Sequence, residues 1–198
     1  MKKKLILASI LLVTSTYANE NRYFVSVCLG KAYETIKGTV QNNSAEVTGN
    51  ATSFNINGGV FFDEQSRASI GFTTYSGANS TINSLEFTCD YFFNLKNKNL
   101  KPFIGAGYML LQHSENTTNT NDITWDNSTI DLTTNILLVR IGVEHDINKN
   151  IYMSFLYDYA LTKSGNTNVG FTYDDNHYVA NYEITNASKL EFNIGYRF

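Results

Sequence analysis

The sequence predicts an all-β fold, an eight-stranded antiparallel up-and-down transmembrane β-barrel preceded by a cleaved signal peptide. Three observations favour this fold class. Apolar residues recur at every second position in eight short segments, a period typical of strands with two different faces. Long and short polar connections alternate between these segments, as in a barrel with long loops at one end and tight turns at the other. Charged residues fall on only one face of the predicted strands.

The beginning of the chain has the features of a secretory signal peptide. Three lysines follow the first residue, an apolar run extends from Leu5 to Val13, and Thr16 and Ala18 provide a small-x-small cleavage site. The apolar run is too short to cross a bilayer as a helix, which needs about 20 residues. We therefore expect residues 1–18 to be removed and residues 19–198 to form the outer-membrane β-barrel domain.

Composition restricts the classes of protein to which the chain can belong. Removing the three N-terminal lysines from its 15 basic residues leaves 12 against 18 acidic residues, a net charge near −6. Without a basic patch, the chain is not expected to bind nucleic acid. No apolar run reaches the length of about 18 residues that a transmembrane helix needs. Aromatic residues make up 14% of the chain and charged residues 17%, which favours strands joined by polar loops.

The clearest strand is the last one. In residues 190–198 every second residue is large and apolar, and the residues between are polar or small. The same alternation predicts seven more strands, at 23–30, 54–62, 67–74, 85–93, 102–110, 137–144 and 153–160. Long polar connections are expected at 33–51, 113–131 and 163–186, a shorter one at 77–83, and tight turns at 63–66, 96–100 and 146–150. Weak alternation in 171–184 predicts that the last hairpin projects beyond the membrane.

Charge placement supports the assignment of the two strand faces. The outward positions of the predicted strands carry no charged residue, whereas the inward positions carry nine. These are Arg67, Glu86, Asp90, Arg140, Glu144, Asp158, Lys189, Glu191 and Arg197. A lipid-facing lysine or arginine at the bilayer midplane would cost about 2–4 kcal/mol. Because the nine charges are nearly balanced in sign and such a barrel is just wide enough for side chains, we expect a polar network that closes the lumen.

Two parts of the chain carry a resemblance to a known family. They are the strand Lys101-Pro102-Phe103-Ile104-Gly105-Ala106-Gly107-Tyr108 and the terminal Phe198 with Tyr196 two residues before it. With these features the chain resembles the small outer-membrane barrels of the OmpA-transmembrane-domain, OmpX and opacity-protein type. The resemblance covers the whole mature chain.

This resemblance implies a location and partners. The barrel would cross the outer membrane of a Gram-negative bacterium with both termini periplasmic, in contact with outer-membrane lipid and lipopolysaccharide. In that family a terminal aromatic strand is the signal read by the outer-membrane assembly machinery. The resemblance gives this role to Phe192, Ile194, Tyr196 and Phe198. The peptidoglycan-binding domain of full-length OmpA proteins, and the cell-wall tethering that it provides, are not expected after the last strand.

The candidate catalytic pairs are weak. His113-Ser114 does not match the His-x-Ser-Asn pattern of barrel phospholipases and lipid A deacylases, and adjacent strand residues point to opposite faces. We therefore interpret both as polar loop residues. Asp175-Asn176-His177 has the Asp-x-His spacing of the omptin proteases, which need ten strands and a second acidic pair; turn chemistry is the simpler interpretation. Three histidines and two cysteines show no metal-ligand spacing. We expect no enzyme activity, no metal and no cofactor.

The two cysteines are not expected to form a disulfide. Cys28 is placed inward on the first predicted strand and Cys89 outward on the fourth. A disulfide needs Cα atoms within about 7 Å, which opposite faces of non-neighbouring strands do not provide. Both are interpreted as small apolar side chains that fill space.

Two functions remain open. The first is a monomeric, non-enzymatic surface protein whose extracellular loops serve envelope stability or adhesion, with a host or surface ligand as partner. Aromatic loop residues, namely Trp125, Tyr173, Tyr178 and Tyr182, would either anchor such a partner or pack the loops together. The alternative is a narrow porin-like channel for ions or small solutes. It would be lined by Glu86, Asp90, Arg140, Glu144 and Arg197. The alternative fold is a soluble periplasmic β-sandwich.

Overall fold

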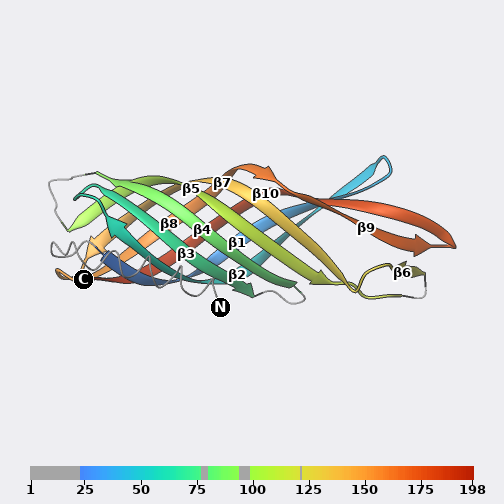
Figure 1. The fold of residues 1–198 in the computed structure, drawn as a ribbon, viewed down its shortest axis with the longest axis horizontal. Coiled ribbons are helices and arrows are strands. Elements are labelled where there is room, and N and C mark those ends of the chain that lie inside the picture. The colour runs from blue at the N-terminus through green and yellow to red at the C-terminus, as the bar shows by residue number, and fades with distance from the viewer. Residues whose placement is uncertain (1–22, 77–79, 94–98, 121) are drawn as a thin grey trace, which may run out of the picture.

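The computed structural model describes residues 23–76, 80–93, 99–120 and 122–198, which form an elongated barrel with hairpins extending from one end (Figure 1). The predicted signal peptide, residues 1–18, lies outside the described residues. The described residues contain ten strands: β1 (Tyr23–Val40), β2 (Asn43–Phe61), β3 (Ser66–Ser76), β4 (Ser80–Phe92), β5 (Leu100–Asn116), β6 (Ile123–Trp125), β7 (Thr129–Asp146), β8 (Ile151–Ser164), β9 (Asn166–Tyr173) and β10 (Asn176–Arg197). In this part of the chain, no helix is long and apolar enough to cross a membrane.

Eight of the described strands close into a ring. The order is β1-β2-β3-β4-β5-β7-β8-β10, and β10 pairs with β1 to complete it. Every neighbouring pair in the ring is antiparallel. The ring leaves no free strand edge, which is the condition for a sheet to lie in lipid. The predicted up-and-down eight-stranded barrel is confirmed.

The two faces of each ring strand differ as the alternation predicts. Large apolar side chains point outward and are exposed, forming a surface that we call the apolar belt. It includes Val25, Val27, Leu29, Phe54, Ile56, Ile70, Phe72, Phe87, Tyr91, Ile104, Tyr108, Leu137, Ile141, Phe155, Tyr157, Leu190, Ile194 and Tyr196, at 38–60% exposure. The residues between them point into the lumen and are mostly buried. A continuous exposed apolar surface of this kind suits a lipid environment rather than water.

The two ends of the barrel are built differently. At the end that we call the short-turn end, residues 62–65 join β2 to β3 and residues 147–150 join β7 to β8. Tyr23 and Phe198 meet there, since the Phe198 N–H donates to the Tyr23 carbonyl at 2.9 Å. At the opposite end, the hairpin end, β1–β2 and β9–β10 extend well beyond the ring, with β6 alongside β9 (Figure 1).

The sequence-based prediction of long polar loops is wrong in part. Residues 33–51 were expected to be a connection, but β1 and β2 stay paired from Tyr23↔Val60 to Val40↔Asn43, so that only two residues form the turn. Residues 163–186 likewise contain β9 and the first half of β10. In the β1–β2 extension the alternation is inverted and built from smaller residues, since Ala32, Val40 and Ala45 face inward, whereas Lys37 and Glu46 face outward. An alternation with few large apolar residues is easily taken for a polar loop. The last hairpin extends beyond the ring of strands, and its position beyond the membrane stays a prediction.

Candidate functional site

The barrel interior carries its charges in two layers. The structure places all nine charged residues predicted to face inward inside the barrel, each at most 7% exposed. The layer near the short-turn end, here the lower layer, contains Arg67, Asp90, Glu144 and Arg197. The central layer contains Glu86, Arg140, Asp158, Lys189 and Glu191. Buried charges of this density require close partners, because taking an unpaired charge out of water is costly.

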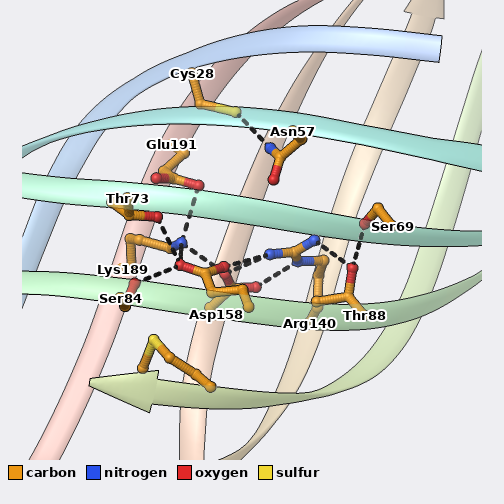
Figure 2. A network of polar contacts seen from close by, with 12 residues as sticks. Cys28, Asn57, Ser69, Thr73, Ser84, Thr88, Arg140, Asp158, Lys189 and Glu191 are labelled. Atoms are coloured by element: carbon orange, nitrogen blue, oxygen red, sulfur yellow. Dashed lines mark hydrogen bonds and ion pairs between the residues drawn. The ribbon is translucent and has the colours of Figure 1, made fainter. Parts of the chain in front are cut away.

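In the central layer two cations share three carboxylates. Arg140 binds Asp158 through two hydrogen bonds, Nε to Oδ1 at 2.6 Å and Nη2 to Oδ2 at 2.7 Å. Lys189 Nζ lies 2.6 Å from Glu86 Oε1, 3.2 Å from Glu191 Oε2 and 3.5 Å from Asp158 Oδ2. Figure 2 shows Lys189 and Arg140 on either side of Asp158. Because these residues come from β4, β7, β8 and β10, the network joins distant strands across the lumen.

Hydroxyl side chains add hydrogen bonds to the carboxylates and to Arg140 in this layer. Thr73 and Ser84 donate to Glu86 Oε1 at 2.8 and 3.1 Å. Thr88 Oγ1 accepts from Arg140 Nη1 at 3.2 Å (Figure 2). The Ser53 hydroxyl lies 3.4 Å from Glu191 Oε1. A buried carboxylate has several lone pairs, and neutral donors satisfy those that the cations leave unused. The layer is therefore a fixed network rather than a row of free charges.

The lower layer combines ion pairs with aromatic rings. Arg67 binds Asp90 through Nε and Nη2, at 3.0 and 2.7 Å, and Glu144 through Nη1 at 2.9 Å. Glu144 also binds Arg197. The Arg67 guanidinium lies 4.8–5.7 Å from the ring centroids of four phenylalanines, Phe24, Phe61, Phe92 and Phe103. Cation–π contacts are strongest where water is excluded, so the rings stabilise the charge and fill the lumen around it.

Comparison with known proteins gives the fold of the chain. No protein-family model and no curated protein matches the sequence. Among solved structures, the chain is similar to the Neisserial surface protein A, NspA, at 17% identity over 91% of this chain and 100% of that one, with a TM-score of 0.54. It is similar to the N-terminal β-barrel domain of Pseudomonas aeruginosa OprF at 12% identity over the same shares, with a TM-score of 0.54. The chain has the fold of a small outer-membrane barrel. The predicted resemblance is confirmed at the level of the fold.

The large apolar residues of the last strand that were predicted to guide assembly lie on the outer face of the barrel. Ile194, Tyr196 and Phe198 are 45–58% exposed, and Phe192 is half-buried against Phe155 with ring centroids 4.9 Å apart. Tyr196 and Phe198 pack edge to face at 5.3 Å, next to the short turns. Their place on the surface is compatible with recognition by another protein, which stays a prediction.

Sequence reasoning missed two groups of charged residues. Asp146, assigned to a tight turn, ends β7 and lies 2.7 Å from Arg197 and 2.8 Å from Lys101, so it extends the lower layer to the rim. His113 was interpreted as a polar loop residue, and this is wrong. It is 7% exposed and faces inward on β5, with Nδ1 3.3 Å from Glu34 Oε2. Continuing the alternation of β5 from Phe103 by steps of two would have placed it inside.

The aromatic residues of the hairpin end pack against one another. Trp125 in β6 lies on Phe171 in β9 with ring centroids 5.2 Å apart, and Phe171 stacks on Tyr178 in β10 at 5.5 Å. Of the two roles left open for these residues, the structure shows loop packing for Trp125 and Tyr178. His177 Nε2 lies 2.9 Å from Asp126 Oδ2, which ties the same segments together.

Among the described residues, the cysteines and the His113-Ser114 pair form neither a disulfide nor a catalytic pair. Cys28 is buried and Cys89 is exposed, and neither forms a disulfide. Within the described ranges, no group of three or more His, Cys, Asp or Glu side chains is arranged to hold a metal ion. Ser114 donates to Asp131 at 2.5 Å, while the neighbouring His113 faces the lumen. The two residues of the candidate Ser/His pair therefore lie on opposite faces of β5.

Proposed function

We propose that this chain is a monomeric, non-enzymatic outer-membrane surface protein in which a closed barrel anchors extended hairpins. The hairpins serve envelope stability, adhesion or both, through contact with lipopolysaccharide or with a host or surface ligand. The apolar belt supports insertion in a bilayer, because so much exposed apolar surface is unfavourable in water. The solved structures of similar fold, NspA and OprF, are described as a surface protein and a β-barrel domain.

The observation that carries this proposal is the unequal construction of the two ends. The strands of the β1–β2 hairpin have 18 and 19 residues and β10 has 22, whereas a transmembrane β-strand needs only about 9–11. The excess lies entirely at the hairpin end. Outer-membrane barrels have short turns in the periplasm and long loops outside. By this rule the hairpin end faces the medium and both termini face the periplasm, where Phe192, Ile194, Tyr196 and Phe198 would meet the assembly machinery.

The channel alternative has less support. It requires inward charges that ions can approach, but Arg140 and Lys189 are held by Glu86, Asp158 and Glu191 at 2.6–3.5 Å. The narrow lumen of an eight-stranded barrel leaves little room beside such pairs. An envelope enzyme has less support still, since His113 and Ser114 point to opposite faces of their strand.

Epitope insertion tests the proposed orientation. A short tag inserted between Asp174 and Asp175, in the β9–β10 turn, should bind antibody on intact cells. A matched tag between Asn148 and Lys149, in the β7–β8 turn, should bind only after the outer membrane is permeabilised. The opposite pattern would overturn the orientation. Recovery of the untagged protein in the soluble periplasmic fraction would overturn the outer-membrane location.

A further inference from the structure

The half of the lumen nearest the hairpin end contains a large cavity. Its volume is about 560 Å3, and we call it the apolar chamber. Much of its wall is apolar and includes Met109, Leu111, Leu132, Ile136, Ala160 and Ala187. The interior of an eight-stranded barrel is ordinarily filled by its own side chains. The apolar chamber is therefore unusual for an eight-stranded barrel. Its volume lies within the range of about 300–1,000 Å3 that is typical of small-molecule binding sites.

The chamber results from an uneven distribution of side-chain size around the ring. Six alanines line the chamber from β1, β2, β8 and β10, namely Ala32, Ala45, Ala51, Ala160, Ala180 and Ala187. These four strands are consecutive in the ring. Most of the larger buried side chains of this region come from the opposite side, from β3, β4, β5 and β7. Small residues gathered on one wall leave space that the other wall does not reach.

The chamber is closed at one end and open at the other. Its floor is formed by Asp158 and Lys189, each 4% exposed and both fixed in the central layer. Its lining continues to Val47, which is 70% exposed, and to Glu115, whose side chain is 50% exposed. In the part of the chain that the structure describes, the chamber therefore opens toward the hairpin end, where a ligand would enter.

Two buried polar atoms beside the mouth have no hydrogen-bond partner among the described residues. They are Glu34 Oε1 and His113 Nε2, and both residues line the chamber. Their other atoms are paired with each other, Nδ1 to Oε2 at 3.3 Å. His113 Nε2 lies 3.9 Å from Glu115 Oε2, beyond hydrogen-bond distance. Several buried side-chain atoms of the described residues lack a partner, and these two are the ones whose residues line the chamber. Because buried polar atoms are generally satisfied in folded proteins, a polar group of a molecule in the chamber would supply what they lack.

We propose that the apolar chamber binds the alkyl tail of a small single-chain amphiphile, whose amine or hydroxyl head bonds Glu34 and His113 at the mouth. An anionic head is disfavoured, because Glu34 and Glu115 both lie at the mouth. Lys189 at the floor does not attract an anion, since it already contacts three carboxylates. This inference goes beyond the proposed function and requires only the folded barrel, whatever its orientation in the membrane.

Two methionines of the mature chain allow this proposal to be tested by nuclear magnetic resonance. It has three methionines, of which Met1 lies in the predicted signal peptide, Met109 lines the chamber and Met153 lies on the lipid-facing side of β8. We would label the methionine methyl groups with carbon-13 in the mature barrel, refolded into phosphatidylcholine nanodiscs without free detergent. Decylamine, decanol and decanoate are then titrated in turn. Decylamine and decanol should shift the Met109 resonance saturably, at concentrations that leave Met153 unchanged, and decanoate should bind more weakly.

Three variants locate the binding. Ala187→Phe fills the chamber and should abolish the Met109 shift, whereas Ala106→Phe adds the same side chain on the lipid-facing side of β5 and should leave it unchanged. Glu34→Gln should weaken decylamine binding by about tenfold, the loss expected for one hydrogen bond to a charged group. If Ala187→Phe does not fold, Ala51→Leu fills the chamber from β2 instead.

The outcomes separate binding in the chamber from partition into the bilayer. Parallel movement of Met109 and Met153, or a Met109 shift that survives in the filled variant, would overturn the proposal. So would a Met109 resonance that none of the three compounds moves. Decanoate binding as tightly as decylamine would overturn the assignment of the head to Glu34 and His113.

Discussion

The two halves of the barrel interior are formed by the same alternating strands, but the side chains that line them differ in kind. Toward the short turns, ion pairs and phenylalanine rings fill the lumen around Arg67 and Arg140. Toward the hairpins, alanines and branched apolar residues leave a chamber of about 560 Å3. The alternation that produces the barrel specifies only that a residue faces inward. The identity of those inward residues decides which half is closed and which half is open.

The largest effect is expected in the closed half, from Glu144→Ala. Glu144 is fully buried and binds both Arg67 and Arg197, so its removal leaves two guanidinium groups short of a partner. Breaking a buried pair from one side costs about 3–5 kcal/mol. Reversible urea unfolding in lipid vesicles, followed by far-ultraviolet circular dichroism, measures this loss.

An exposed ion pair of the hairpin end provides the control for that experiment. Lys37 Nζ lies 3.7 Å from Glu183 Oε1, and their side chains are 34% and 45% exposed. Because water screens such a pair, Glu183→Ala should cost only about 0.2–1 kcal/mol. Equal losses for the two variants would contradict the view that the lower layer is a buried, stabilising network.

A smaller effect is expected when a glycine in each half of the barrel is replaced by alanine, which adds one methyl group. A Cβ on Gly107 would lie 2.6 Å from the Phe87 carbonyl oxygen and 2.7 Å from Thr88 Cγ2, so Gly107→Ala should cost about 1–3 kcal/mol through overpacking. A Cβ on Gly49, which lines the chamber, meets nothing within 4 Å. Gly49→Ala should instead stabilise the protein by about 0.4–1 kcal/mol, because it restricts the unfolded chain. If both substitutions lowered the free energy of unfolding by the same amount, the result would contradict a packed half and an open half of the lumen.

The sequence predicts the closed half better than the open one. Register is a binary choice, so the alternation of β4 and β7 places Glu86 and Arg140 inward once lipid-facing charge is excluded. Which charges pair is a non-local question, since Arg67 and Glu144 are 77 residues apart in sequence and meet only when the ring closes. The chamber depends on six alanines from four strands, and no local pattern distinguishes them from alanines that pack. The paired extension of β1 and β2 beyond the belt gives only a weak signal, because its inward residues, such as Ala32 and Ala45, are small and its polar residues face outward.

The smallest effect is expected outside the lumen, at a short turn. The Gln65 backbone N–H donates to Asp63 Oδ1 at 2.8 Å, and backbone hydrogen bonding lowers the pKa of Asp63 below its usual value. A lowered pKa stabilises the fold at pH values above the unfolded pKa, and this contribution is lost as pH falls through the folded pKa. The stability advantage of the natural protein over Asp63→Ala should therefore shrink from about pH 5 to about pH 2. Urea unfolding at a series of pH values measures it, and an advantage independent of pH would contradict the role of the carboxylate.

The measurement that most directly tests closure of the lumen is single-channel recording from the folded mature barrel in a planar bilayer. Because Arg140 and Lys189 bind carboxylates from other strands across the lumen, we expect no discrete conductance steps from protein whose insertion has been verified. Reproducible openings whose size changes in Arg140→Gln would contradict a closed lumen and would favour the channel alternative.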